Sequence, residues 1–201
     1  QFVKASGEVL DIGLVMIDSG GHYTDEVYQF CRRNPHKYIP IKGATMMGKP
    51  IITFPRKRNR KGVYLSEVGT DSAKDVLYGR LGDVPTSLSG PSPGYRHHPV
   101  AEWADDFYFK GLTCERKRVE FVKGRRVYRW VAPSGARNEP TDCAVYALAG
   151  IRLGVQHRGW RLIAKPRPTP INPSPPASVK PAASAAGNSW LGTSSGSGGW
   201  L

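Results

Sequence analysis

Apolar and polar positions along the first part of the chain predict strands and helices in turn. Residues 9–17 end in a continuous apolar run, which is typical of a strand covered on both faces. After a Gly-rich turn, Val27, Phe30 and Cys31 recur at the i, i+3, i+4 spacing of a helix. Residues 38–41 form the next short strand. This order predicts two parallel strands joined by a right-handed crossover.

A third strand and a second helix continue this α/β pattern. Residues 63–68 predict the strand, and a turn with capping residues follows it. In the helix after that turn, Ala73, Leu77 and Leu81 share one apolar face. We expect Lys74 to lie off that face.

A loop, a short helix and a hairpin come next. Residues 83–99 are rich in Pro and Gly and predict a loop, and residues 102–112 predict an aromatic-rich helix. Residues 118–122 and 127–131 alternate in polarity around a Lys-Gly pair, which is typical of a β-hairpin.

The last periodic segment is a helix that begins near Asn138. Asn138 is a suitable capping residue, and Pro140 is tolerated only in a first helical turn. The small and apolar side chains that follow, such as Ala144, Val145 and Leu148, indicate close packing of this helix on the sheet.

The composition changes sharply near Ala164. The 36 residues of 166–201 include seven Pro, seven Ser and no acid, and they cannot bury a core. We therefore expect one domain over residues 1–163 and a disordered Pro/Ser/Gly/Ala-rich tail over residues 164–201.

The chain contains no apolar run of about 18 residues, so we expect no membrane partner. Its three distant Cys residues predict neither a disulfide framework nor a zinc site.

Basic residues are concentrated in three stretches. The chain has 29 Lys+Arg against 16 Asp+Glu, a formal charge of +13. Residues 27–66, 115–137 and 161–201 together carry +20, which leaves −7 for the remainder. Such clustering indicates a polyanionic partner, above all nucleic acid, although residues 55–62 alone could be a solvated loop. The candidate phosphate-binding residues are Arg56, Lys57, Arg58, Arg60, Lys61, Arg125 and Arg126.

Three carboxylates form the candidate catalytic group. Asp18 ends the first apolar strand, where open α/β sheets place ligand-binding groups. Glu139 and Asp142 are spaced i, i+3 in the first turn of the last helix. If that helix packs across the strand of Asp18, the three carboxylates converge and suit Mg²⁺ or Mn²⁺. Two such ions can hydrolyse a phosphodiester. An Asx turn at Asp18 and helix capping at Glu139 or Asp142 are the alternatives.

Two further side chains are candidates near the same edge of the sheet. Lys42 ends the second predicted strand, and we expect its ammonium group beside Asp18, where it would meet a phosphate. His22 could orient water or phosphate, or it could be a surface residue at the helix start.

Several ordered motifs resemble the large terminase subunit of lambda-type tailed bacteriophages. They are IDSGGHYT at residues 17–24, IKG at 41–43, VGTDSAKD at 68–75 and RNEPTDCAVYAL at 137–148, within a resemblance over residues 9–153. The resemblance implies the C-terminal nuclease domain of the packaging motor. It implies a ribonuclease-H-like mixed sheet flanked by helices. The domain would cut concatemeric double-stranded DNA with two Mg²⁺ or Mn²⁺ ions.

The resemblance also implies residue roles, partners and a location. Asp18 and Asp142 would bind metal, Glu139 would be a ligand or lie beside one, and Lys42 would lie near the cut phosphate. The small terminase subunit and the portal or procapsid would be partners, in the cytoplasm of a bacterial host.

One element of the family pattern is not found in the chain. The family has an Asp on an earlier strand, which we expect to precede Gln1, and Asp11 is a poor substitute because we place it in the strand of Asp18. The sequence therefore predicts a partial nuclease domain. A DNA-binding or docking module of the packaging machinery without catalysis, and an inactive prophage remnant, remain as alternatives.

Overall fold

A three-stranded parallel sheet organises the computed structural model, which describes residues 2–3, 6–83 and 94–161. Its strands are β3 (Val15–Asp18), β4 (Tyr38–Gly43) and β5 (Ser66–Val68), in that order. β3 pairs with β4 and β4 pairs with β5, both in parallel. The α/β class and the predicted parallel neighbours are confirmed, although β5 is shorter than the predicted third strand. An antiparallel bridge between Thr53 and Glu67 adds to β5.

The first apolar segment is not one strand, so the prediction for residues 9–17 is wrong. β1 (Phe2–Val3) and β2 (Val9–Leu10) form a separate antiparallel hairpin, and β3 begins only at Val15. A Cβ atom at Gly13 would lie 2.9 Å from the Trp160 ring, so the chain passes close to this ring between β2 and β3. Asp11 therefore lies outside the strand of Asp18, contrary to the prediction.

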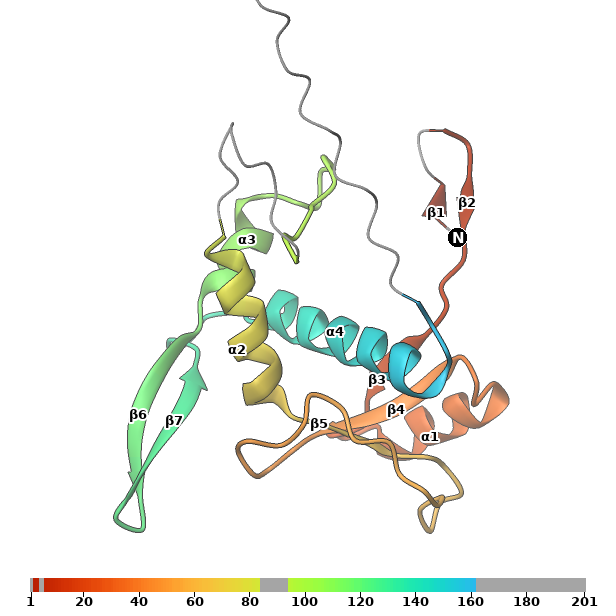
Figure 1. Ribbon diagram of the computed structural model, residues 1–201, viewed down its shortest axis with the longest axis horizontal. Helices are drawn as coiled ribbons and strands as arrows, with labels where there is room; N and C mark the ends of the chain where they lie inside the picture. Colours follow the sequence, from red (N-terminus) through yellow and green to blue (C-terminus); the bar gives the residue numbers. More distant parts are fainter. Residues whose placement is uncertain (1, 4–5, 84–93, 162–201) are drawn as a thin grey trace, which may run out of the picture. The chain divides into compact units, whose positions relative to one another are not determined.

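Helices cover both faces of the parallel sheet (Figure 1). On one face, Phe30 of α1 (Thr24–Arg33) contacts Tyr38 of β4 with 4.6 Å between ring centroids. On the other face, Met16 of β3 packs against Gly150 of α4 (Glu139–His157), which begins where the sequence predicts. Small residues of α4, including Ala144 and Ala149, belong to the buried core, as expected for close packing on the sheet.

The two other helices follow β5 and the loop region. α2 spans Thr70–Leu81, and α3 spans Asp106–Thr113. α3 begins later than the sequence predicts because the Asp105 side chain accepts a hydrogen bond from the Tyr108 N–H at 2.9 Å and caps the helix there. Most of the predicted loop over residues 83–99 lies outside the described residues.

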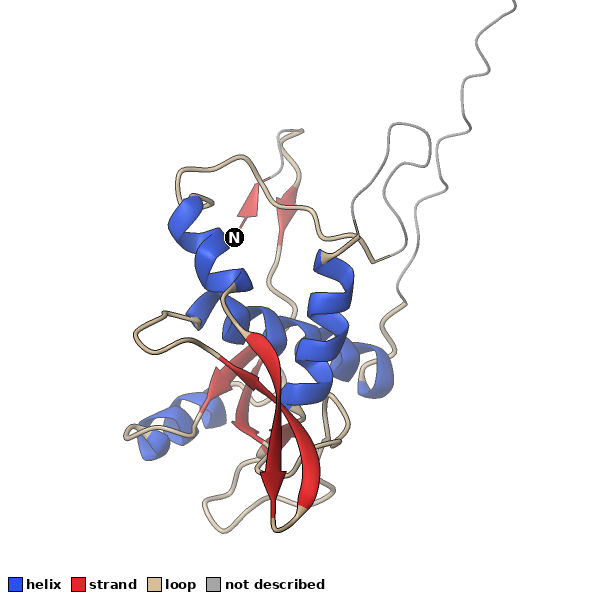
Figure 2. Cartoon of the chain, turned by 90° about the vertical axis from the view of Figure 1, so that its left-hand side faces the viewer, coloured by secondary structure: helices blue, strands red, loops and turns tan. Residues whose placement is uncertain are grey.

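The predicted hairpin is confirmed. β6 (Arg116–Val122) pairs antiparallel with β7 (Arg125–Val131) over seven residue pairs. Lys123 and Gly124 both have positive φ, 50° and 73°, which matches a two-residue turn whose twist suits a hairpin. Figure 2 shows both strands of this hairpin in front of the helices.

A buried ion pair joins α2 to the start of the hairpin. Lys74 Nζ lies 2.7 Å from Glu115 Oε1, with side-chain exposures of 11% and 1%. Asn138 Nδ2 donates a second hydrogen bond to the same oxygen at 2.8 Å. The expectation that Lys74 lies off the buried face of α2 is therefore wrong, since a paired ammonium group can be buried beside Ala73 and Leu77.

Among the described residues, no helix is long and apolar enough to span a membrane. The predicted tail over residues 164–201 lies outside the described residues.

We predict that Lys74→Ala lowers the free energy of unfolding by about 3–5 kcal/mol, because it leaves the Glu115 carboxylate buried without its charge partner. Urea unfolding measures this loss. Asp25→Ala is the control: it breaks the exposed Lys61–Asp25 pair, at 3.1 Å, and changes stability by about 1 kcal/mol or less. Equal effects of the two substitutions would contradict the assignment of Lys74 to the core.

We predict opposite effects for two helical glycines. A Cβ atom at Gly154 would lie 2.1 Å from the Trp160 ring, so Gly154→Ala displaces the ring and destabilises the fold by about 1–3 kcal/mol. Nothing lies within 4 Å of a Cβ atom at exposed Gly79, so Gly79→Ala stabilises by about 0.5–1 kcal/mol. Thermal unfolding of both variants tests the pair of signs.

Candidate functional site

Asp18 lies at the carboxyl end of β3 with both carboxylate oxygens engaged. Oδ1 accepts a hydrogen bond from the Gly20 N–H at 2.8 Å, which is the Asx turn that the sequence leaves open. Oδ2 accepts from the Tyr146 hydroxyl of α4 at 3.0 Å. The turn is held further by the Ser19 hydroxyl, which donates to the Ile41 carbonyl at 2.8 Å. These hydrogen bonds fix the Asp18 carboxylate in place. Because Asp18 is exposed, the carboxylate is also open to solvent.

Asp142 lies one helical turn before Tyr146 on α4, so the two side chains share a face. Burial raises the pKa of the Asp142 carboxyl above its ordinary value, nearby Lys74 opposes that rise, and Glu115 and Asp18 add to it. Burial also raises the pKa of the Tyr146 hydroxyl, as do Asp18 and, more weakly, Asp142. The structure thus brings Asp18 and Asp142 together around Tyr146.

A buried cation stands beside this carboxylate pair. Lys74 Nζ lies 3.5 Å from Asp142 Oδ1 and 2.7 Å from Glu115 Oε1. Glu115 Oε2 is buried without a hydrogen-bond partner among the described residues. Lys74 and Asp142 therefore belong to one charged network that reaches from the core to the exposed site.

Sequence reasoning missed Lys74, Glu115, Asn138 and Tyr146 as members of this network. A signal for Lys74 exists: it is spaced i, i+3 from buried Leu77, so it can share the packed side of α2. Asn138 precedes α4 as predicted, but its side chain makes no capping hydrogen bond and instead donates to Glu115.

Glu139 and Lys42 lie apart from this network. The Glu139 carboxylate contacts the Arg137 guanidinium at 3.1 Å and is exposed. Hydrogen bonding to a backbone N–H and to Arg137 lowers the pKa of Glu139. Lys42 follows Ile41, the residue paired with Asp18, so strand alternation directs its side chain to the opposite face of the sheet.

The predicted phosphate-binding residues occupy two exposed places. One is the loop between Ile52 and Val63, where Arg58 lies over the Tyr64 ring at 5.3 Å and Lys61 pairs with Asp25 at 3.1 Å. The other is the start of β7, which holds Arg125 and Arg126. The loop members Arg56, Lys57 and Arg60 are also exposed.

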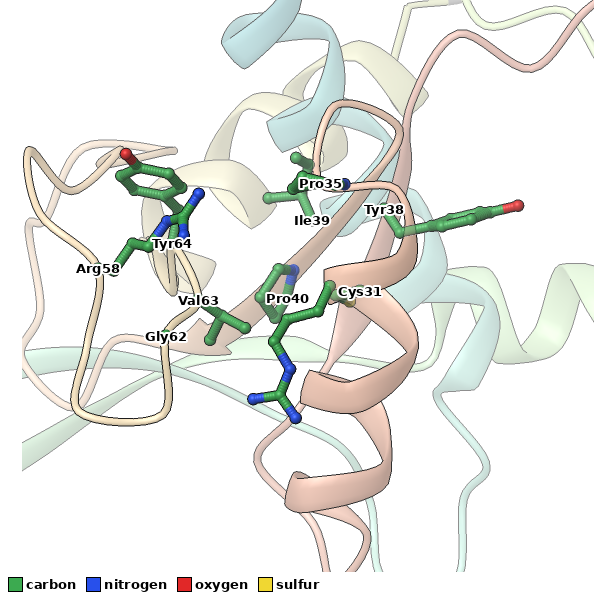
Figure 3. A pocket seen from close by; sticks show the side chains of 10 residues that line it. Cys31, Pro35, Tyr38, Ile39, Pro40, Arg58, Gly62, Val63 and Tyr64 are labelled. Atoms are coloured by element: carbon green, nitrogen blue, oxygen red, sulfur yellow. The ribbon is translucent and has the colours of Figure 1, made fainter.

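A cavity of about 150 Å³ lies beside the basic loop and α1 (Figure 3). Its walls include Cys31, Tyr38 and Pro40, with Arg32 and Arg58 as the charged side chains. Burial raises the pKa of the Cys31 thiol to about 11. No carboxylate lines this cavity, so the acids and the cavity are separate features of the molecule.

The described residues contain no group of three or more His, Cys, Asp or Glu side chains arranged to hold a metal ion. The site offers two carboxylates, Asp18 and Asp142, with a lysine beside one of them. Oxygen donors of this kind suit hard divalent cations, and Mg²⁺ is commonly held by one or two carboxylates together with water and substrate phosphate.

Comparisons with known proteins give the family. A family model of the terminase large subunit gpA endonuclease domain matches residues 1–161. The terminase large subunit of Escherichia phage lambda is 37% identical over 163 residues, or 80% of this chain and 25% of that protein. That of Enterobacteria phage P21 is 38% identical over 164 residues, or 81% of this chain and 25% of that protein. No solved structure matches the chain.

The chain thus spans about a quarter of the length of the two terminase subunits. The family match covers the parallel sheet, the carboxylate pair and the basic hairpin together. This chain belongs to the terminase large subunit gpA endonuclease domain family.

Proposed function

We propose that this chain is a divalent-metal-dependent DNA endonuclease domain of a viral packaging terminase, with a ribonuclease-H-like arrangement of its acids. The observation that carries the proposal is the hydrogen bond at 3.0 Å from the Tyr146 hydroxyl of α4 to Asp18 at the end of β3, with Asp142 one helical turn earlier on the same face of α4. Family membership supports this class of enzyme.

The donor set fits Mg²⁺ or Mn²⁺. Asp18 and Asp142 would hold the cation, and substrate phosphate and water would complete its shell. When bound, such a cation activates water and neutralises charge on the phosphodiester. A second ion would need a further ligand. The candidates are Glu139, in the same first turn of α4 as Asp142, and Glu115, whose Oε2 has no hydrogen-bond partner among the described residues.

The chain's own residues position the acids and the substrate. The Tyr146 hydroxyl and the Gly20 N–H fix the two oxygens of Asp18. The buried Lys74 ammonium group contacts Asp142 and restrains its carboxylate. Preorganised side chains of this kind lower the cost of reorganisation in the reaction. Lys42 would contact a phosphate that extends past the sheet edge toward the opposite face.

The substrate that we propose is concatemeric double-stranded DNA. The basic stretches would hold its phosphates, and the +13 formal charge would favour encounter with it. By family membership we extend the proposal to the small terminase subunit and the portal or procapsid as partners, in the host cytoplasm.

A second candidate function is DNA binding without catalysis. The absence of a group of three or more metal-ligating side chains in the described part of the chain favours it. The two functions differ in one measurable respect, which is metal-dependent cleavage.

We predict that Asp18→Asn and Asp142→Asn each reduce Mg²⁺-dependent nicking of supercoiled plasmid by at least about a hundredfold, because each removes a charge that the cation needs. The assay uses this chain alone and a chimera in which it replaces the matching quarter of the lambda terminase large subunit. Nicked and linear DNA are measured on agarose gels.

Asp106→Asn is the matched control, since Asp106 is an exposed Asp in the first turn of another helix, α3, and forms no hydrogen bond or ion pair with the described site residues. It should keep full activity. Nicking by the chimera that survives both site substitutions would overturn the assignment of these acids. Binding of duplex DNA with no cleavage by either protein would support the second function.

A further inference from the structure

We propose that the β6–β7 hairpin is an arm that holds the backbone of duplex DNA, and that its root on α2 couples the bound DNA to the Asp142 network. The part concerning Asp142 rests on the proposed function. The DNA-binding arm stands on the geometry and charge of the hairpin itself.

The root of the hairpin is fixed by several contacts to α2. Asp75 accepts hydrogen bonds from Lys117 of β6 at 2.8 Å and from Trp130 Nε1 of β7 at 2.8 Å. Tyr78 stacks on Trp130 with 4.2 Å between ring centroids, and its hydroxyl accepts from the Glu115 N–H at 3.2 Å. An isolated two-stranded hairpin is marginally stable in water, so these contacts explain its order at the root.

The same helix carries the cation of the acid network. Lys74 precedes Asp75, and it contacts both Asp142 and Glu115. Glu115 directly precedes Arg116, the first residue of β6. A displacement of the hairpin root would therefore move both Lys74, through Asp75, and Glu115, through Arg116.

One face of the hairpin beyond its root is basic. Cross-strand pairing places Arg118 opposite Arg129, and Arg125 opposite Val122, on this face. Arg129 is paired with Glu120 at 3.3 Å. Arg118 and Arg125 are exposed and form no hydrogen bond or ion pair with any described residue.

The opposite face is aromatic and lies on the side of the α2 contacts. Phe121 is 74% exposed, and the Tyr128 ring lies 5.0 Å from the Arg126 guanidinium and 5.7 Å from Lys117 Nζ. The guanidinium groups of Arg118 and Arg125, which have no partner among the described residues, therefore lie on one face, whereas Arg126 on the other face lies over the Tyr128 ring.

Duplex DNA fits this surface better than other polyanions. Residues 116–131 contain seven Lys+Arg and one acid. Guanidinium groups bind phosphate oxygens in a bidentate manner, and the major groove admits a two-stranded β-ribbon. The free arginines lie on a two-stranded ribbon of this kind, whereas a flat anionic membrane would not select for that shape.

The first experiment measures binding of a fluorescent duplex to the 201-residue chain in EDTA, so that no cleavage occurs. We expect the double substitution Arg118→Gln/Arg125→Gln to weaken binding on the order of tenfold and to reduce the salt slope by about 1.8, since two phosphate contacts are lost. Lys110→Gln/Arg152→Gln is the charge-matched control on exposed helical positions, and it should bind like the parent chain.

Equal binding by the hairpin double variant and the control would overturn the proposal. The proposal would also be overturned if the hairpin double variant lost binding to anionic vesicles but bound DNA as the parent chain does. Because no metal is present, this result is independent of whether the chain is an endonuclease.

The second experiment tests coupling by hydrogen exchange with and without duplex DNA. We expect DNA to increase protection in the hairpin and also in α2 around Lys74. Asp75→Ala should abolish the protection in α2 and keep the salt slope, because the basic side chains remain. Protection confined to the hairpin of the parent chain would overturn the coupling.

Discussion

The Lys74–Glu115 pair is the interaction on which the arrangement of this domain depends. Burying either charge alone would be costly, so the two must meet, and their meeting fixes α2 against the residue that starts β6. Asn138 joins the pair from the residue before α4. Three segments that lie far apart in the sequence are therefore held at one buried point, and Asp142 lies at its exposed side.

Periodicity predicts the elements of this fold well where the turn or capping residues that bound an element lie within or next to it in the sequence. The hairpin follows from alternation and a Lys-Gly turn, and α4 follows from its start signals and its small residues. The prediction of one strand over residues 9–17 is wrong because apolar composition alone does not reveal a break. Gly13, within the break, lies against Trp160 from a distant part of the chain. α3 begins late because a local side-chain cap overrides the aromatic run.

The candidate site was predictable in its exposed members and not in its buried ones. Asp18 and Asp142 stand at positions where strand ends and helix starts commonly carry function. The sequence places Lys74 off the apolar face of α2, and only the partner Glu115, 41 residues away, makes its burial possible. Glu139 shares helical spacing with Asp142, but a nearer arginine, Arg137, engages it instead.

The adjacency of Lys74 and Asp75 limits how the length of this chain can vary. Successive residues of a helix point about 100° apart, and these two use that difference to reach the acid network and the hairpin root. One residue inserted in the first turn of α2 would rotate both side chains away from their partners at once. The loop of residues 56–61 is mostly exposed, and its Lys61–Asp25 ion pair is exposed too, so insertions and deletions among related chains should collect there and avoid α2.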